Sequence, residues 1–140
     1  MIKTFIIVIA FSIFSSCNEK HVPEEIKDIF FEMEPLAQDI EWLSNKGLYQ
    51  VYYTLNKSEK TSYFDKQGNW LETESEITKE KLPLTIIEVL NTQFYEYTIE
   101  DIELVETFDK QILYEVDLQK GEKEYDILFD VSGKILRKKI

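Results

Sequence analysis

Hydrophobic and polar positions along this chain of 140 residues follow two kinds of pattern, which occur twice in the same order. Apolar residues recur at helical spacing after Pro23 and again after Pro83, and proline suits the first turn of a helix because its missing amide needs no partner there. The sequence therefore predicts two amphipathic helices. Their expected core-facing residues are Ile26, Ile29, Phe30 and Met33 in the first helix, and Ile86, Ile87, Leu90 and Phe94 in the second.

Alternating apolar and polar residues after each helix predict four β-strands. The first set is expected at residues 40–43, 49–55, 61–64 and 70–73, and the second at 102–107, 113–118, 125–129 and 135–138. The last two strands of each set flank a turn, which reads FDKQGNW at residues 64–70 and FDVSGKI at residues 129–135. In both turns the aspartate can accept local amide hydrogen bonds and the glycine can adopt positive φ, so each segment predicts a hairpin.

The two sets of elements are related as copies. VPEEI at residues 22–26 corresponds to LPLTI at 82–86, and the offset of 60 residues grows to 62 and then 65 through insertions in the connections. A repeat present only twice indicates two halves of one domain, since a solenoid needs about three or more stacked units. We expect one domain at residues 22–140, with halves at 22–77 and 78–140. The predicted class is α+β: two tandem units of a helix plus a four-stranded antiparallel meander, forming one sheet with both helices on one face.

The N-terminus has the features of an export signal. A short positive start, MIK, precedes an apolar run at residues 4–14 that is too short to span a bilayer, and FSSC follows at residues 14–17. This segment resembles a bacterial lipoprotein signal, which implies cleavage after residue 16, a lipid anchor on Cys17 and a tether at residues 17–21. An ordinary cleaved signal or a membrane anchor with an incidental cysteine is the alternative. Cys17 is the single cysteine, so no disulfide can form within one chain.

The chain is strongly acidic. Removing residues 1–16 takes away only Lys3 among the charged residues, so the net charge goes from -11 to about -12. This charge argues against binding to nucleic acid or to an anionic membrane surface. It favours a basic partner or cations, although it also serves simply to keep a protein soluble.

Strand alternation divides the predicted sheet into two faces. The face toward the helices should carry Tyr49, Val51, Tyr53, Tyr114, Val116, Leu118, Tyr125, Ile127 and Phe129, and the open face Gln50, Tyr52, Thr54, Leu113, Glu115, Asp117, Asp126 and Leu128. A three-residue turn with a glycine bulge would pair Phe64 with Trp70 and Tyr63 with Leu71, which places Trp70 in the core.

The open face is the candidate partner-binding surface. It is expected to present an apolar patch rimmed by carboxylates from Glu72 or Glu115 and Asp117, and the patch consists of Tyr52, Tyr63, Leu71, Leu113, Leu128 and Leu136. Aromatic and aliphatic side chains in such a patch offer the contact area that protein partners use. The alternative is that these side chains only cover one another on a twisted sheet.

The sequence offers no catalytic constellation. His21 is the single histidine and lies in the tether, and neither zinc-ligand spacing nor a phosphate-binding glycine loop is present. Glu72, Glu74 and Glu76 alternate along one strand, where they form a solvated face or, alternatively, chelate Ca²⁺. Residues 65–69, DKQGN, superficially suggest a calcium loop, but Lys66 is unfavourable there and the turn interpretation is preferred. We expect no cofactor and no metal.

The proline-led helix, the hairpin YFDKQGNWLETE at residues 63–74 and the duplication together resemble the PepSY-like family of envelope lipoproteins. The second copy of the hairpin is degenerate, with Lys134 and Ile135 in place of Asn69 and Trp70. The resemblance implies a fold similar to that of β-lactamase-inhibitor protein, and a non-enzymatic, lipid-anchored protein on the periplasmic side of the outer membrane. Its expected role is to bind another protein or peptide through the open sheet face. The alternatives are an acidic cation-binding or structural envelope lipoprotein and, by fold analogy, a peptidase inhibitor.

Overall fold

The order of helices and strands is that of two successive helix-plus-meander segments. The computed structural model describes residues 22–139, so the expected signal segment, Cys17 and the tether lie outside it. The first segment contains α1 (Glu24–Met33), β1 (Gln38–Asn45), β2 (Leu48–Leu55), β3 (Ser58–Phe64) and β4 (Trp70–Glu76). The second contains the short helix η1 (Lys79–Lys81), α2 (Leu84–Gln93), β5 (Thr98–Thr107), β6 (Ile112–Lys120), β7 (Lys123–Asp130) and β8 (Ile135–Lys139).

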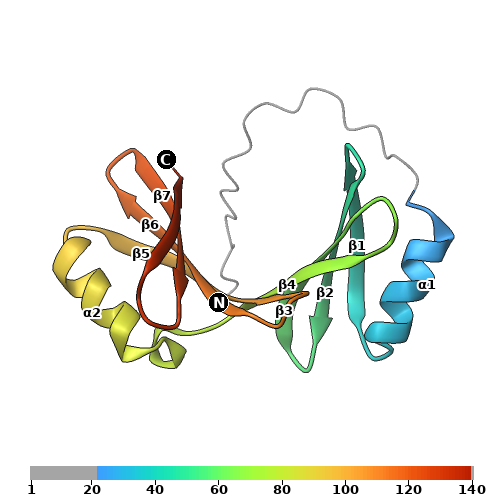
Figure 1. The fold of residues 1–140 in the computed structure, drawn as a ribbon, viewed down its shortest axis with the longest axis horizontal. Coiled ribbons are helices and arrows are strands. Elements are labelled where there is room, and N and C mark those ends of the chain that lie inside the picture. Colours follow the sequence, from blue (N-terminus) through green and yellow to red (C-terminus); the bar gives the residue numbers. More distant parts are fainter. Residues whose placement is uncertain (1–21, 140) are drawn as a thin grey trace, which may run out of the picture.

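All eight strands form one antiparallel sheet in chain order, β1 to β8. Both predicted helices and all eight predicted strands are present, and every strand extends beyond its predicted bounds. The sheet is strongly bent, and α1 and α2 lie at its two ends on the outer, convex side (Figure 1). Among residues 22–139, no helix lies on the inner, concave face (Figure 1).

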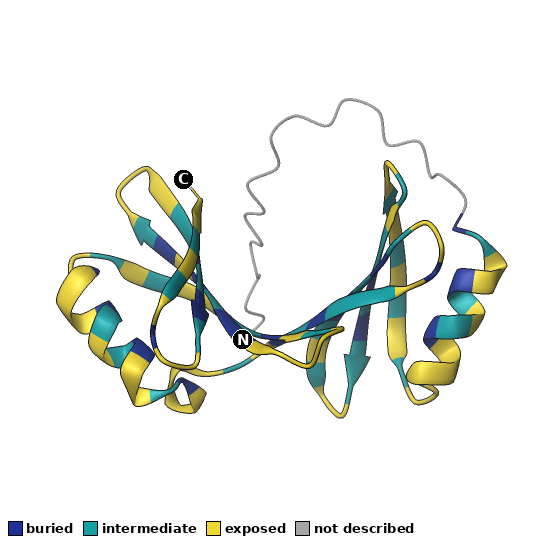
Figure 2. Ribbon diagram, viewed as in Figure 1, coloured by how far each residue is buried: buried dark blue, intermediate teal, exposed yellow. Residues whose placement is uncertain are grey.

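Two separate hydrophobic clusters hold the helices to the sheet. Under α1, the fully buried Phe30 makes edge contacts with Trp42, Tyr53 and Phe64, with ring centroids 5.5, 5.0 and 6.5 Å away. Under α2, Ile86 and Leu90 pack against a buried group from β5, β6 and β7. Each helix therefore turns its buried stripe toward the sheet and leaves its other side exposed (Figure 2).

One helix residue departs from the prediction. Met33 is 40% exposed, because it is the last residue of α1 and the chain turns away toward β1 directly after it. The sheet residues predicted to face the helices are confirmed: Val51, Tyr53, Tyr114, Val116, Leu118, Ile127 and Phe129 are buried, and Tyr49 and Tyr125 are partly buried against the same clusters.

Trp70 is also confirmed as part of the core. It packs against the α1 cluster, and its indole N–H donates a hydrogen bond to Thr73 Oγ1 at 2.9 Å. Thr73 and Ser62 hydroxyls are 2.7 Å apart, and Ser62 lies 3.1 Å from the Tyr53 hydroxyl. Because these hydroxyls satisfy one another, polar side chains can be buried at the edge of the first cluster without an unpaired group.

The two hairpin turns have the same hydrogen bonds. Asp65 N–H donates to the Asn69 carbonyl and Gly68 N–H to the Asp65 carbonyl, both at 3.0 Å, and the corresponding bonds from Asp130 and Gly133 are also 3.0 Å. The carboxylate of each aspartate accepts backbone amides within its turn. Residues 65–69 are therefore a turn of the expected chemistry, and their aspartate is engaged within it.

Phe64 pairs with Trp70 as predicted, but the expected pairing of Tyr63 with Leu71 is wrong. The register shifts by one residue after Trp70, so Tyr63 faces Glu72 and Leu71 is the extra residue. A similar irregularity between β7 and β8 makes Leu136 the extra residue of the second hairpin. Such bulges increase the local twist and re-aim the side chains that follow.

Candidate binding cleft on the concave sheet face

The concave face carries the side chains that point away from both helices. Residues directly opposite on neighbouring strands share a face, and one row runs from Glu41 through Tyr52, Thr61, Glu74 and Val105 to Leu113. The adjacent row runs from Glu76 through Glu103, Glu115 and Leu128 to Arg137. The predicted open-face residues Tyr52, Leu113, Glu115 and Leu128 thus lie on this face.

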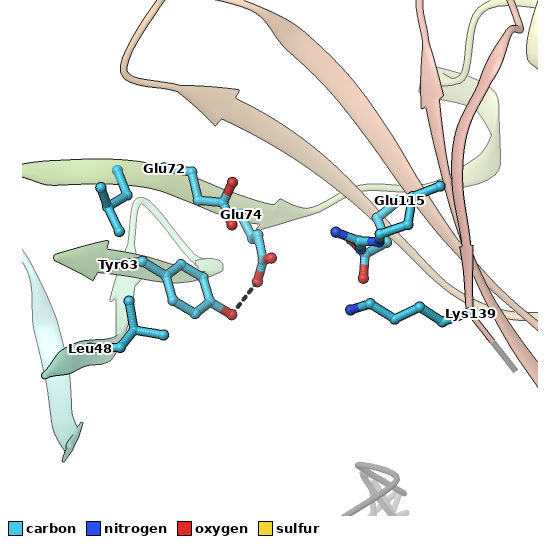
Figure 3. Close-up of a pocket in the computed structure, with 8 residues that line it drawn as sticks. Leu48, Tyr63, Glu72, Glu74, Glu115 and Lys139 are labelled. Carbon is cyan, nitrogen blue, oxygen red and sulfur yellow. Dashed lines mark hydrogen bonds and ion pairs between the residues drawn. The ribbon is translucent and has the colours of Figure 1, made fainter. Parts of the chain in front are cut away.

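A cleft of about 360 Å³ crosses the middle of this face. Its lining residues come from β2 to β4 and from β6 and β8, and they are Leu48, Tyr63, Leu71, Glu72, Glu74, Glu115, Arg137 and Lys139. Figure 3 shows Tyr63 and Glu74 joined on one side of the cleft, with Glu115 and Lys139 on the other. The bend of the sheet brings these side chains together across strands that are far apart in the sheet order.

Carboxylates occupy the interior of the face, whereas the sequence suggested that they form only its rim. Glu103 lies directly between Glu76 and Glu115, and Asp117 lies directly between Asp101 and Asp126. Like charges opposite one another in a sheet destabilise it. The patch is therefore a mixed aromatic and acidic surface, and the predicted apolar patch with an acidic rim is wrong in this respect.

Burial raises the pKa of several of these carboxyl groups. The pKa of Glu103 rises to about 9, first because of burial and then because of the negative charges of Glu74 and Asp101. Among residues 22–139, none donates a hydrogen bond to the Glu103 side chain or forms an ion pair with it. The charged form of Glu103 is accordingly disfavoured at neutral pH.

Glu74 is the second raised carboxyl group of the cleft. Its pKa rises to about 7, mainly through burial, and the hydrogen bond from the Tyr63 hydroxyl, 2.8 Å long, opposes the rise. The same burial and the charge of Glu74 hold the pKa of Tyr63 well above its ordinary value, so Tyr63 stays protonated and donates. Glu74 was predicted to be a solvated strand residue, and its half-buried place on a concave surface is a correction that only the bend of the sheet reveals.

The cationic residues of this face, Arg137 and Lys139, form ion pairs with carboxylates on β6 and β7. Arg137 Nη2 lies 2.6 Å from Glu115 Oε2 and 3.1 Å from Asp126 Oδ1, and Lys139 Nζ lies 3.4 Å from Asp126 Oδ2. Burial, followed by the negative charge of Asp126, nevertheless raises the pKa of Glu115 to about 7, and the positive charge of Arg137 opposes this rise. The cations thus compensate the acidic groups of β6 and β7, and none of them bonds Glu74 or Glu103.

One group of carboxylates is close enough to hold a metal ion. Oxygens of Glu115, Asp117 and Asp126 lie within 4.8 Å of one another. Arg137 and Lys139 already bond Glu115 and Asp126, so these carboxylates have cationic partners from the protein itself. The carboxylates that the sequence offered for Ca²⁺ were Glu72, Glu74 and Glu76, and in the described part of the chain they do not form such a group.

The six candidate binding residues have different surroundings. Tyr63 and Leu71 line the cleft, whereas Leu113 is buried and Leu128 half-buried on the same face. Leu136 is 44% exposed at its bulge and is not one of the residues that line the cleft. Sequence reasoning missed Glu103, Arg137 and Lys139. Strand alternation alone could have placed Glu103 on the open face, but no sequence pattern indicated that it would be half-buried.

These features define a class of protein: an α+β protein with one open, curved antiparallel sheet, helices on the convex face and a helix-free concave face. The chain belongs to the family described as "Putative beta-lactamase-inhibitor-like, PepSY-like", whose model matches residues 47–137. The resemblance proposed from the hairpin sequence is therefore confirmed. None of the helices in residues 22–139 is long and apolar enough to cross a membrane.

Solved structures share this fold. A protein of Bacteroides eggerthii described as a "putative periplasmic" protein is 20% identical, with a TM-score of 0.78, over 85% of this chain and 88% of its own. A DUF2874 family protein of Bacteroides uniformis is 19% identical, with a TM-score of 0.77, over 85% of this chain and 89% of its own. A BLIP-like protein of Bacteroides fragilis is 24% identical, with a TM-score of 0.70, over 86% of this chain and 88% of its own. A comparison with functionally curated proteins finds no match.

Proposed function

We propose that this protein is a non-enzymatic binding protein whose concave sheet face docks another protein or a peptide. The observation that carries the proposal is that both helices cover the convex face and leave the concave face open, with a cleft of about 360 Å³ across it. Tyr63 and Leu71 give this cleft apolar contact area, and the polar groups around them provide directional contacts. Membership of a β-lactamase-inhibitor-like family supports a role in protein binding, and inhibition of a peptidase is its narrower form.

We further propose that the protein is exported and held at the periplasmic side of the outer membrane by a lipid on Cys17. The lipoprotein-like segment at residues 14–17 supports the anchor, and the described periplasmic relative of Bacteroides eggerthii supports export. The matching backbone hydrogen bonds of the two hairpin turns support an origin of the domain by duplication of one helix-plus-meander unit.

Photo-crosslinking in the cell that makes the protein tests the docking proposal. A photoreactive amino acid is placed at Leu71 in the cleft, at Leu136 on the β8 bulge, and at the 83% exposed Leu84 on the convex side as a control. We expect a discrete crosslinked product from Leu71 and none from Leu84. Products from Leu84 alone would contradict docking on the concave face, and a product from Leu136 alone would move the contact to the edge of the sheet.

A further inference from the structure

The floor of the concave face contains acidic side chains that form no ion pair with any cation among residues 22–139. Glu74 receives one hydrogen bond, from Tyr63, and Glu103 receives none from the described residues. Both lie on adjacent strands, β4 and β5, at positions that the bend of the sheet half-buries. Half-buried carboxylates are ordinarily paired with a cation or fully hydrogen-bonded, so these two are incompletely compensated.

The cations on the same face are already engaged by other carboxylates. Arg137 and Lys139 are bonded to Glu115 and Asp126, toward the β8 edge of the sheet. By register, the carboxylates of the face are Glu41, Glu59, Glu72, Glu74, Glu76, Asp101, Glu103, Glu115, Asp117, Glu124, Asp126 and Asp130, against these two cations. The face therefore retains an excess of negative charge after its internal ion pairs are counted.

Resting on the proposed function, we propose that the concave face binds a cationic segment of its protein partner, with a lysine or arginine side chain seated in the cleft against Glu74, and with Glu103 on the neighbouring strand adding negative charge beside the cleft. The geometry suits such a side chain. Tyr63, Leu48 and Leu71 on the β2 to β4 side give its methylene groups an apolar wall, and Glu72 and Glu74 lie beside that wall for its charged end. Charge complementarity of this kind selects partners and rejects acidic ones.

A bound cation and protons compete for the carboxyl groups of Glu74 and Glu103. The pKa of Glu74 is about 7 and that of Glu103 about 9, so one or both groups hold a proton at neutral pH and must release it when the cation is seated. The charged and titratable groups around them are Tyr52, Tyr63, Glu72, Glu76, Asp101, Glu115, Asp117, Asp126 and Arg137. Most of these are negative, so a bound cation shifts both carboxyl groups toward ionisation. Affinity should therefore rise as the pH rises.

The test is a selection of random linear peptides from a display library against the full chain purified in mild detergent, at pH 8. We expect the selected peptides to carry lysine or arginine, and a synthesised consensus peptide to bind at least about tenfold more tightly at pH 8 than at pH 6. Glu74→Gln should weaken this peptide by about tenfold at pH 8 and flatten the pH dependence. Glu106→Gln is the matched control, because it removes the same charge from β5 on the opposite, helix-bearing face.

The outcomes separate this inference from the proposed function. If the selected peptides lack cations, or bind Glu74→Gln as tightly as the parent, yet lose affinity when Leu71 is changed to Asp, the cationic inference is wrong and the concave docking face stands. If the peptides bind the Leu71→Asp and Glu74→Gln variants unchanged, they bind elsewhere and the cationic inference fails, while the crosslinks from Leu71 decide the docking face. If no peptide is selected, the cationic inference fails, and the crosslinks from Leu71 alone decide the docking face.

Discussion

At the scale of single residues, the Tyr63 to Glu74 hydrogen bond opposes the effect of burial on the pKa of Glu74. The Tyr63 hydroxyl donates to Glu74 Oε2 at 2.8 Å, and a donor stabilises a carboxylate in its ionised form. This bond works against the burial that raises the pKa of Glu74 to about 7. Tyr63 on β3 thus favours the ionised, negatively charged form of Glu74 on β4 near neutral pH.

Replacing Tyr63 with Phe should raise the pKa of Glu74 further, by roughly one pH unit, because the ionised form loses its donor. Carbon-13 NMR titration of the glutamate carboxyl groups measures this directly. Tyr52→Phe serves as the control, since Tyr52 lies on the same face and its hydroxyl does not hydrogen-bond to Glu74. An unchanged titration of Glu74 in Tyr63→Phe would show that the hydrogen bond does not hold in solution.

At the scale of elements, each hairpin turn is fitted against the helix of its own half. Gly133 has φ +83°, and a Cβ atom built on it would lie 2.8 Å from the Thr85 carbonyl oxygen in the first turn of α2. The Thr85 hydroxyl in turn donates to the Val131 carbonyl at 2.8 Å. The β7 to β8 turn and α2 therefore meet backbone to backbone, and a glycine is required for both conformation and space.

Gly133→Ala should destabilise the protein by at least twice as much as Gly121→Ala. Gly121 has φ +62°, but a Cβ atom added to it would meet no atom within 4 Å, so its substitution costs only the conformational penalty of about 1 kcal/mol. Gly133→Ala adds displacement of the α2 backbone, for which no flexible side chain can compensate. Urea unfolding of the two variants measures the difference, and equal losses would show that the turn moves away from α2 without cost.

At the scale of the whole molecule, the concave carboxylates make the free energy of unfolding depend on pH. Burial, followed by neighbouring negative charges, raises the pKa of Glu103 to about 9 and that of Asp117 to about 6. A group whose pKa is raised on folding binds more protons in the folded state, so the stability it contributes is lost as the pH rises from the ordinary value to the folded one. Stability should fall between about pH 4 and pH 9.

Glu103→Gln should remove much of this dependence and stabilise the protein at pH 9 by about 1–3 kcal/mol, because it abolishes a half-buried charge without a partner. Thermal unfolding followed by circular dichroism at pH 5 and pH 9 measures the effect. Glu106→Gln, on the exposed opposite face of the same strand, should leave the pH dependence unchanged. A parent protein that is more stable at pH 9 than at pH 5 would show that the concave carboxylates are fully solvated.

The sequence by itself determined the secondary structure and the division of the sheet into faces. Helical spacing after Pro23 and Pro83, period-two alternation and two aspartate-glycine turns depend on residues close in the chain, so they can be read locally. The turn chemistry also placed Trp70 in the core, where Phe64 pairs with it. The family resemblance followed from the same hairpin, at residues 63–74.

Only the tertiary structure decided the side-chain register and the chemical character of the open face. The bulge after Trp70 moved Tyr63 from Leu71 to Glu72, because a bulge depends on the twist of the whole hairpin. The bend of the eight-stranded sheet half-buried Glu74 and Glu103 on a surface that a flat sheet would have left solvated. Burial and cross-strand charge depend on residues far apart in sequence, and so the acidic character of the cleft could not be derived from local patterns.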